Sequence, residues 1–263
     1  MGPVSAIKKG FELAGKNWGL IVILFLLNFF SGVMGGPLSA VQENVSIGMI
    51  FLGALTVIFF LFLSIFIQAG LLGCIKEAIK SGQTKIGNMV ALGKKYFLRL
   101  LGLTLLIGFI VVLFAVFSGV GLLLRGNGGG IFLKSLGMFI SILFGVLAIC
   151  AAIALFYAPY VLIADDCPII ASMRKSIDFI KRFLGKSLGT GIAVILVVIA
   201  ASILLAVLLI PLASLTGSLE EPSGLFQFIS NILGSGLNAY LGIVGMTAFM
   251  SLYMGLTAEK EQS

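Results

Sequence analysis

Long apolar runs without a charged residue alternate with short basic segments along this chain. Each run is close to or above the roughly 20 residues that a helix needs to cross the hydrocarbon core of a bilayer. The clearest basic segment follows Asp165-Asp166, and weaker copies begin at Pro3 and Lys85. The pattern predicts a membrane exit, a surface helix and a membrane re-entry, used about three times.

The apolar runs predict six membrane-spanning helices. They are expected at residues 20–34, 49–67, 100–124, 135–163, 187–212 and 225–256. The second should continue as a helix to Lys80, and the sixth is longer than a crossing requires, so it is tilted, broken or projecting. Pro159 is expected to kink the fourth span near its inner end and to free a carbonyl about one turn earlier.

The basic segments predict interfacial helices with one apolar and one charged face. The first, residues 3–15, has Val4, Ile7, Phe11 and Ala14 at helical spacing, with lysines on the other face. The second is residues 85–99. The third, residues 168–186, has an apolar stripe of Ile170, Met173, Ile177, Ile180 and Leu184 between its basic residues. Asp165 or Asp166 is expected to cap this third helix.

The predicted fold class is all-α: a polytopic membrane protein of six transmembrane helices arranged as three hairpins, each preceded by a basic amphipathic interfacial helix. One integral membrane domain covers residues 1–263. It contains repeat units at residues 3–84, 85–167 and 168–257 and a short charged tail at 258–263. All units have the same orientation, so we expect parallel repeats with pseudo-threefold symmetry, unlike the inverted repeats of many transporters.

Composition and charge place the chain in a membrane and orient it. Hydrophobic residues make up 60% of the chain and charged residues 10%, against about a quarter charged in soluble domains. All basic residues except Arg125 and Lys134 flank the predicted inner side. We therefore expect a plasma-membrane protein with both termini cytoplasmic. Topology also explains the net charge of +7 better than a nucleic-acid partner does.

The residue types argue against an enzyme. There is no histidine, and three scattered cysteines do not form a metal-ligand pattern. No Asp, Glu, Lys or Arg lies within a predicted span. The Asp165-Asp166 pair is a candidate cation ligand or acid-base pair, but a helix cap explains it more simply. We expect no cofactor, no metal and no catalytic residue.

Two sets of residues are candidate binding sites. Basic side chains beside the inner ends of spans are candidates for anionic lipid headgroups: Lys94, Lys95, Arg99, Arg174, Lys175, Lys181 and Arg182. They also serve as topology signals. Polar residues at membrane depth form a candidate polar path. Its predicted lining is Asn28, Gln68 and Asn238, and Asn231 and Tyr240 lie nearby. Hydrogen bonding between helices is the simpler role for these residues. Gly32/Gly36 and Gly185/Gly189 match the spacing of close helix contacts.

These features give two functional hypotheses. The first is a non-catalytic scaffold that binds membrane lipids, anionic ones in particular, or a partner protein at the cytoplasmic face. The second is a transporter or lipid-translocating protein with a polar path between hairpins. The sequence does not indicate an oligomeric state.

Two sequence segments carry a family resemblance: FYAPYVLIADDCPIIASMRKSIDFIKRFLG at residues 156–185 and AIKKGFELAGKNWG at residues 6–19. An aromatic-proline span end, an acidic pair and a basic-aromatic helix follow one another there. The chain resembles a family of uncharacterised six-pass prokaryotic membrane proteins, which is similar to the membrane domain of some glycerophosphodiester phosphodiesterases. The resemblance implies a role in envelope organisation or lipid-linked processes. Phosphodiesterase activity is not expected, because the sequence stops at Ser263 without that domain.

Overall fold

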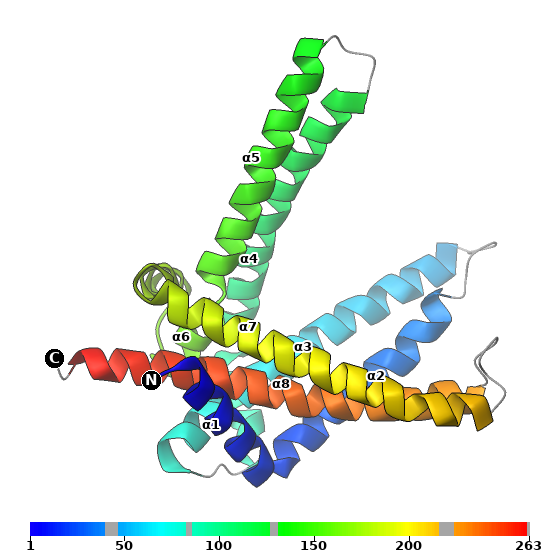
Figure 1. The fold of residues 1–263 in the computed structure, drawn as a ribbon, viewed down its shortest axis with the longest axis vertical. Helices are drawn as coiled ribbons and strands as arrows, with labels where there is room; N and C mark the ends of the chain where they lie inside the picture. The colour runs from blue at the N-terminus through cyan, green and yellow to red at the C-terminus, as the bar shows by residue number, and fades with distance from the viewer. Residues whose placement is uncertain (40–46, 83–85, 127–130, 216–223, 262–263) are drawn as a thin grey trace. The chain divides into compact units, whose positions relative to one another are not determined.

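The computed structural model describes residues 1–39, 47–82, 86–126, 131–215 and 224–261. As predicted, these residues form helices and no strand. The helices are α1 (Pro3–Lys16), α2 (Trp18–Ser39), α3 (Ile47–Ser81), α4 (Asn88–Gly126), α5 (Ile131–Leu155), α6 (Ala158–Ala164), α7 (Ile169–Leu215) and α8 (Gly224–Glu261) (Figure 1). Two compact units divide the chain: unit 1 comprises Met1–Phe97 and Gly185–Ser263, and unit 2 comprises Leu98–Leu184.

Several helices are long and apolar enough to cross a membrane. Among the described residues they are Phe51–Ser81, Asn88–Leu124, Ile131–Ala164, Ile169–Pro211 and Phe226–Glu259. Helices α1 and α2 supply a sixth candidate only when they are taken together across an 89° bend. The chain is thus a helical, membrane-embedded protein, and the arrangement as six spans in three hairpins stays a prediction.

Helix α8 is the centre of unit 1, because α1, α2 and α3 all pack against it (Figure 1). At Gly10 of α1, an added Cβ would lie 2.6 Å from the carbonyl oxygen of Val244. At Gly242, it would lie 3.0 Å from a side-chain carbon of Leu24. The C-terminal half of α8 is therefore a packing core, which explains why the sixth apolar run exceeds the length of one crossing.

Helix α1 lies nearly perpendicular to α2, as expected for a surface helix followed by a span. The bend of 89° is at Asn17, whose side-chain amide donates to the Leu13 carbonyl at 2.8 Å and closes α1. The buried face of α1 consists of Ala6, Gly10, Leu13 and Ala14. This buried face is narrower than predicted and contains more small residues. Val4, which is expected on the apolar face, is 79% exposed.

The second basic segment packs on the C-terminal part of α3. Residues Met89 and Leu92, at the start of α4, lie against Gly70 and Gly73, where an added Cβ would meet them at 2.7 and 2.9 Å. Phe66 of α3 covers Gly93 in the same way, at 3.0 Å. The sequence predicts a surface segment distinct from the following span, but α4 is assigned as a single helix from Asn88 to Gly126. Lys85 lies outside the described residues.

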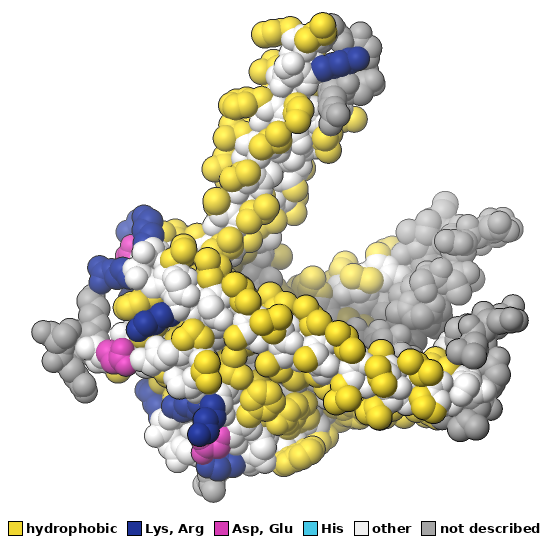
Figure 2. All heavy atoms as spheres, in the orientation of Figure 1, with side chains coloured by type: hydrophobic (Ala, Val, Ile, Leu, Met, Phe, Trp, Pro, Cys, Tyr) yellow, Lys and Arg dark blue, Asp and Glu magenta, His cyan; other side chains and the backbone are white. Residues whose placement is uncertain are grey.

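In unit 2, the described parts of α4 and α5 form a closely packed pair. The rings of Phe117 and Phe144 stack with centroids 4.9 Å apart. Gly121 lies directly on α5, since an added Cβ would be 2.6 Å from the Gly137 carbonyl oxygen. Exposed hydrophobic side chains are spaced along α5, as the visible face in Figure 2 shows, which is expected of a helix in lipid.

The expected kink before Pro159 is present. Helix α5 ends at Leu155, and α6 begins at Ala158 with the proline in its first turn. The hydroxyl of Ser176 in α7 donates to the Ala154 carbonyl at 2.7 Å, so a side chain satisfies a carbonyl near the break. Helix α7 has its own break at Phe183, whose φ of −122° and ψ of 30° are not helical. This break separates the predicted third surface helix from the fifth span.

Candidate functional site

A polar groove lies between α2 and α8, within unit 1. It has a volume of about 540 Å³ and is open on one side. Helix α2 supplies part of the lining and α8 the larger part. The lining residues are Asn28, Ser31, Gly32, Ser230, Asn231, Gly234, Ser235 and Asn238. We call this feature the α2–α8 groove.

Helical spacing gathers these residues on two facing stripes. On α2, Asn28, Ser31 and Gly32 are three and four positions apart and therefore share a face. On α8, Asn231, Ser235 and Asn238 follow the same rule. The aromatic pair Phe29 and Phe228, with ring centroids 6.0 Å apart, joins the two helices beside the polar stripes. The groove is thus built into the contact between two predicted spans.

The lining of the groove is neutral and rich in hydrogen-bonding groups. Each asparagine amide offers two donors and one acceptor oxygen, and each serine hydroxyl offers both functions. None of the lining residues that the structure describes is charged. The Ser230 hydroxyl oxygen is buried and has no hydrogen-bond partner in the described part of the chain. A buried hydroxyl without a partner is costly, so this atom indicates a place where a polar group from outside the chain would be stabilised.

The groove unites part of the predicted polar path. Asn28 and Asn238 line it together, and Asn231, which the sequence analysis places at membrane depth, joins them. Gln68 is not among the lining residues. Gly32, predicted to make a close helix contact, instead lines open space, with nothing within 4 Å of an added Cβ. By contrast, Gly189 is closely packed, because an added Cβ would lie 3.3 Å from a side-chain carbon of Pro3.

Sequence reasoning missed the serines of the groove. Ser31, Ser230 and Ser235 are unremarkable in sequence, because serine is common in transmembrane helices and bonds to its own backbone. The available signal was their helical register with the asparagines. It becomes informative only when α2 and α8 are known to be neighbours.

The seven predicted headgroup-binding residues are all exposed. Lys94 and Lys95 belong to unit 1, and Arg99, Arg174, Lys175, Lys181 and Arg182 belong to unit 2. Two of those in unit 2 are engaged in ion pairs. Arg99 Nη1 lies 2.8 Å from Asp166 Oδ1, and Lys175 Nζ pairs with Asp165 Oδ2. Arg99 therefore links the turn between α6 and α7 to α4, and Lys175 links the same turn to α7.

The acidic pair adopts a strained, well-held turn. Asp165 ends α6, and Asp166 has a φ of 50°, in the left-handed region that aspartate tolerates better than most residues. Both carboxylates make the ion pairs described above, and their role as a cap of α7 stays a prediction. Within the described ranges, no group of three or more His, Cys, Asp or Glu side chains is placed to hold a metal ion.

The first part of α7 has a buried side and an exposed side. The buried side includes Ser172, Ser176 and Phe179, and the ring centroid of Phe179 lies 4.8 Å from that of Tyr157. The exposed side carries the apolar Ile170 and Leu184. It also carries three basic side chains that take no part in the ion pairs with Asp165 and Asp166: Arg174, Lys181 and Arg182. We call this last set the α7 basic face.

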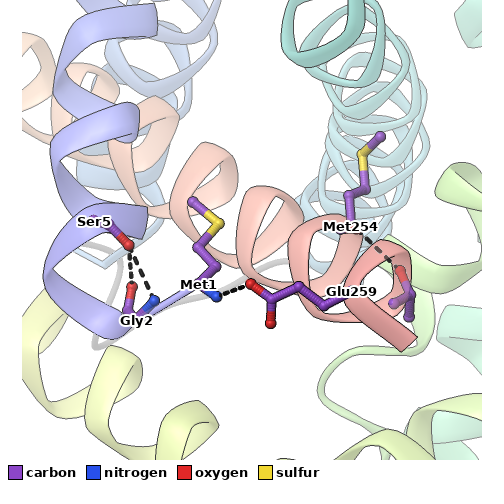
Figure 3. A network of polar contacts seen from close by, with 6 residues as sticks. Met1, Gly2, Ser5, Met254 and Glu259 are labelled. Carbon is purple, nitrogen blue, oxygen red and sulfur yellow. Dashed lines mark hydrogen bonds and ion pairs between the residues drawn. The ribbon is translucent and has the colours of Figure 1, made fainter. Parts of the chain in front are cut away.

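The N-terminus lies beside the C-terminal end of α8 within unit 1. The Met1 ammonium lies 2.5 Å from Glu259 Oε1. Figure 3 shows this contact next to the first turn of α1, where the Ser5 hydroxyl donates to the Gly2 carbonyl at 2.8 Å. The two ends of the described chain therefore share one side.

The comparisons with known proteins give a family and no function. A family model described as a domain of unknown function, DUF7847, matches residues 2–259, and the chain belongs to this family. No curated protein and no solved structure matches the chain. The resemblance to the membrane domain of glycerophosphodiester phosphodiesterases gains no support from these comparisons.

Proposed function

We propose that this DUF7847 protein is a non-catalytic membrane protein that binds anionic lipid headgroups at its cytoplasmic face. The observation that supports the proposal is the α7 basic face. Arg174, Lys181 and Arg182 are exposed beside exposed apolar side chains, which is the combination that lets a helix rest at a headgroup layer. Each basic residue close to an anionic surface contributes roughly 1 kcal/mol.

The ion pairs divide the predicted headgroup residues into two roles. Arg99 and Lys175 hold the acidic turn through Asp166 and Asp165. Their positive charge is partly compensated, so they contribute less to a lipid surface than the α7 basic face does. This division refines the sequence hypothesis, in which all these residues bind lipid alike.

The topology is also part of the proposal. The protein crosses the plasma membrane six times, and both termini lie in the cytoplasm. The contact between Met1 and Glu259 supports an even number of crossings. Each basic segment packs on another apolar helix: α1 on α8, the start of α4 on α3, and the first part of α7 on the α5–α6 break. This recurring contact supports three related units.

The proposal is tested with the full chain in bilayers of equal phosphatidylglycerol and phosphatidylcholine content. Lipids retained by the released protein are counted by native mass spectrometry. Replacing Arg174, Lys181 and Arg182 by glutamine should lower the ratio of retained phosphatidylglycerol to phosphatidylcholine about tenfold. Lys134→Gln, an exposed change on α5, is the control and should leave the ratio unchanged. An unchanged ratio in the triple variant would contradict the proposal.

The α2–α8 groove favours the second candidate, a transporter or lipid-translocating protein. It brings Asn28 and Asn238 together as a polar path requires. If the groove translocates lipid, Asn28→Ala with Asn238→Ala should slow the exchange of a fluorescent lipid between leaflets of reconstituted vesicles. An exchange rate equal to that of empty vesicles for the unaltered protein would reject this candidate.

A further inference from the structure

We infer that the α2–α8 groove is a binding site for the head region of a neutral, hydroxyl-bearing lipid such as a diacylglycerol. The inference goes beyond the proposed function, because it concerns a different surface, made by α2 and α8, and a different class of lipid. It depends on the size, chemistry, depth and entrance of the groove.

The size of the groove suits a small polar group. Its volume of about 540 Å³ falls within the range of roughly 300–1,000 Å³ that is typical of small-molecule sites. Two glycines create this space: nothing lies within 4 Å of an added Cβ at Gly32 or Gly234. A glycerol unit with its ester groups fits such a volume, and a whole helix does not.

The chemistry of the groove selects a neutral ligand. Asparagine and serine supply donors for carbonyl oxygens and acceptors for hydroxyl hydrogens. Among the described residues, the lining has no basic side chain for a phosphate and no carboxylate for a cation. The unpartnered Ser230 hydroxyl would gain a hydrogen bond from a bound hydroxyl or ester group. A glycerol backbone with one free hydroxyl and two ester carbonyls matches these functions.

The depth of the groove also excludes a charged headgroup. Helix α2 begins at Trp18, which is 65% exposed and suited to the membrane interface. Asn28 lies ten residues further on, or about 15 Å along the helix axis. This is close to the middle of a hydrocarbon core about 30 Å thick. A charged headgroup would lose its hydration at that depth, whereas a diacylglycerol head carries no charge.

The entrance of the groove is apolar, as acyl chains require. Leu26 and Phe30 on α2 and Phe228 and Leu233 on α8 flank the polar stripes and are 44%, 54%, 53% and 44% exposed, respectively. These side chains face the surroundings of unit 1 rather than its core. Acyl chains of a bound lipid would therefore leave the groove directly into the bilayer, and no separate tunnel is needed.

The inference is tested by photolabelling the full chain in phosphatidylcholine nanodiscs. The probe is a diacylglycerol with a diazirine near the glycerol end of one acyl chain, and labelled peptides are mapped by mass spectrometry. Labelling should concentrate on residues 25–32 and 228–238. Gly234→Leu should lower it about tenfold, because the new side chain occupies the ligand's volume. Asn28→Ala and Asn238→Ala should each lower it about threefold.

Matched controls separate groove binding from other effects. Gly191→Leu on α7 also adds a side chain where nothing lies within 4 Å, and it should leave labelling unchanged. Gly32→Leu provides a second blocking variant if Gly234→Leu does not fold, as judged by circular dichroism and size-exclusion chromatography. A probe with a methyl ether in place of the free hydroxyl should label less, since it cannot donate a hydrogen bond.

Three results would overturn the inference. Uniform labelling along the spans would show general lipid contact only. Equal labelling by a phosphatidylglycerol probe would show that charge is not excluded. Efficient disulfide formation between copies carrying Asn231→Cys, with no labelling of the groove, would show that a second copy of the chain covers it. None of these results bears on the α7 basic face, so the proposed function is tested separately.

Discussion

The α4–α5 pair and the α2–α8 pair use polar side chains within a membrane in opposite ways. Between α4 and α5, the Ser118 hydroxyl donates to the Ser141 carbonyl at 3.0 Å, and the two hydroxyl oxygens are 3.3 Å apart. Between α2 and α8, polar side chains line an open groove, and the Ser230 hydroxyl has no partner among the described residues. Polar residues in spans thus hold helices together where they face each other, and line a groove where glycines leave space between the helices.

Glycine substitutions should show the largest difference between the two pairs. In the α4–α5 pair, Gly121→Leu places a side chain where a Cβ alone would be 2.6 Å from a backbone oxygen, so we expect destabilisation of about 1–3 kcal/mol or more. Gly234→Leu enters open space and should be tolerated. Thermal unfolding in detergent measures both. Equal melting temperatures for the two variants would contradict the packing of the hairpin.

Cysteine reactivity should show the next largest difference. A cysteine at Asn231, in the groove, should react with a small membrane-permeant maleimide about tenfold faster than native Cys150 on α5, because the thiolate is the reactive form and a polar lining favours it more than lipid does. Cys150 is exposed but lies on the apolar surface of the α4–α5 pair. Burial raises the pKa of the Cys167 thiol, so this residue adds little background. Equal rates at the two positions would contradict a polar environment in the groove.

Loss of the serine pair should have a smaller effect. Ser118→Ala combined with Ser141→Ala removes the side-chain hydrogen bonds between α4 and α5, and double-mutant cycles for such bonds in membranes average about 0.6 kcal/mol. The melting temperature should fall slightly. A cycle of the two single variants and the double variant gives the coupling energy, and a value of zero would mean that the serines do not stabilise the hairpin.

The smallest effect is expected at the groove serine. Ser230→Ala removes a buried hydroxyl that has no partner, so unfolding should be unchanged or require slightly more free energy. The same thermal measurement applies, in bilayers without diacylglycerol. A clear loss of stability would mean that the Ser230 hydroxyl is satisfied within the protein, and that the groove is a structural feature.

Sequence patterns predicted the helical class and much of the local structure because hydropathy and proline act locally. The apolar runs correspond to long helices, α1 is set at an angle to α2 at Asn17, and the chain breaks before Pro159. The predicted break before the third span is absent from α4, because Met89 to Gly93 pack as regular helix on α3. That packing depends on a neighbour, which local patterns do not specify.

The candidate sites were predicted only in part for a similar reason. Asn28 and Asn238 stood out because asparagine is unusual in a span, but their meeting depends on the adjacency of α2 and α8. The basic residues were found from charge alone. Their division into the α7 basic face and the pairs with Asp165 and Asp166 depends on the left-handed turn at Asp166, which brings together residues from distant parts of the sequence.

The central place of α8 has a consequence for biosynthesis. Helices α1, α2 and α3 pack on α8, yet α8 leaves the ribosome after all of them. The nascent chain must therefore hold three inserted or surface-bound helices without their final neighbour, and Asn28 faces lipid during that interval. Early insertion intermediates of this protein should accordingly be good clients for membrane chaperones, and assembly of unit 1 should be a late, post-insertion event.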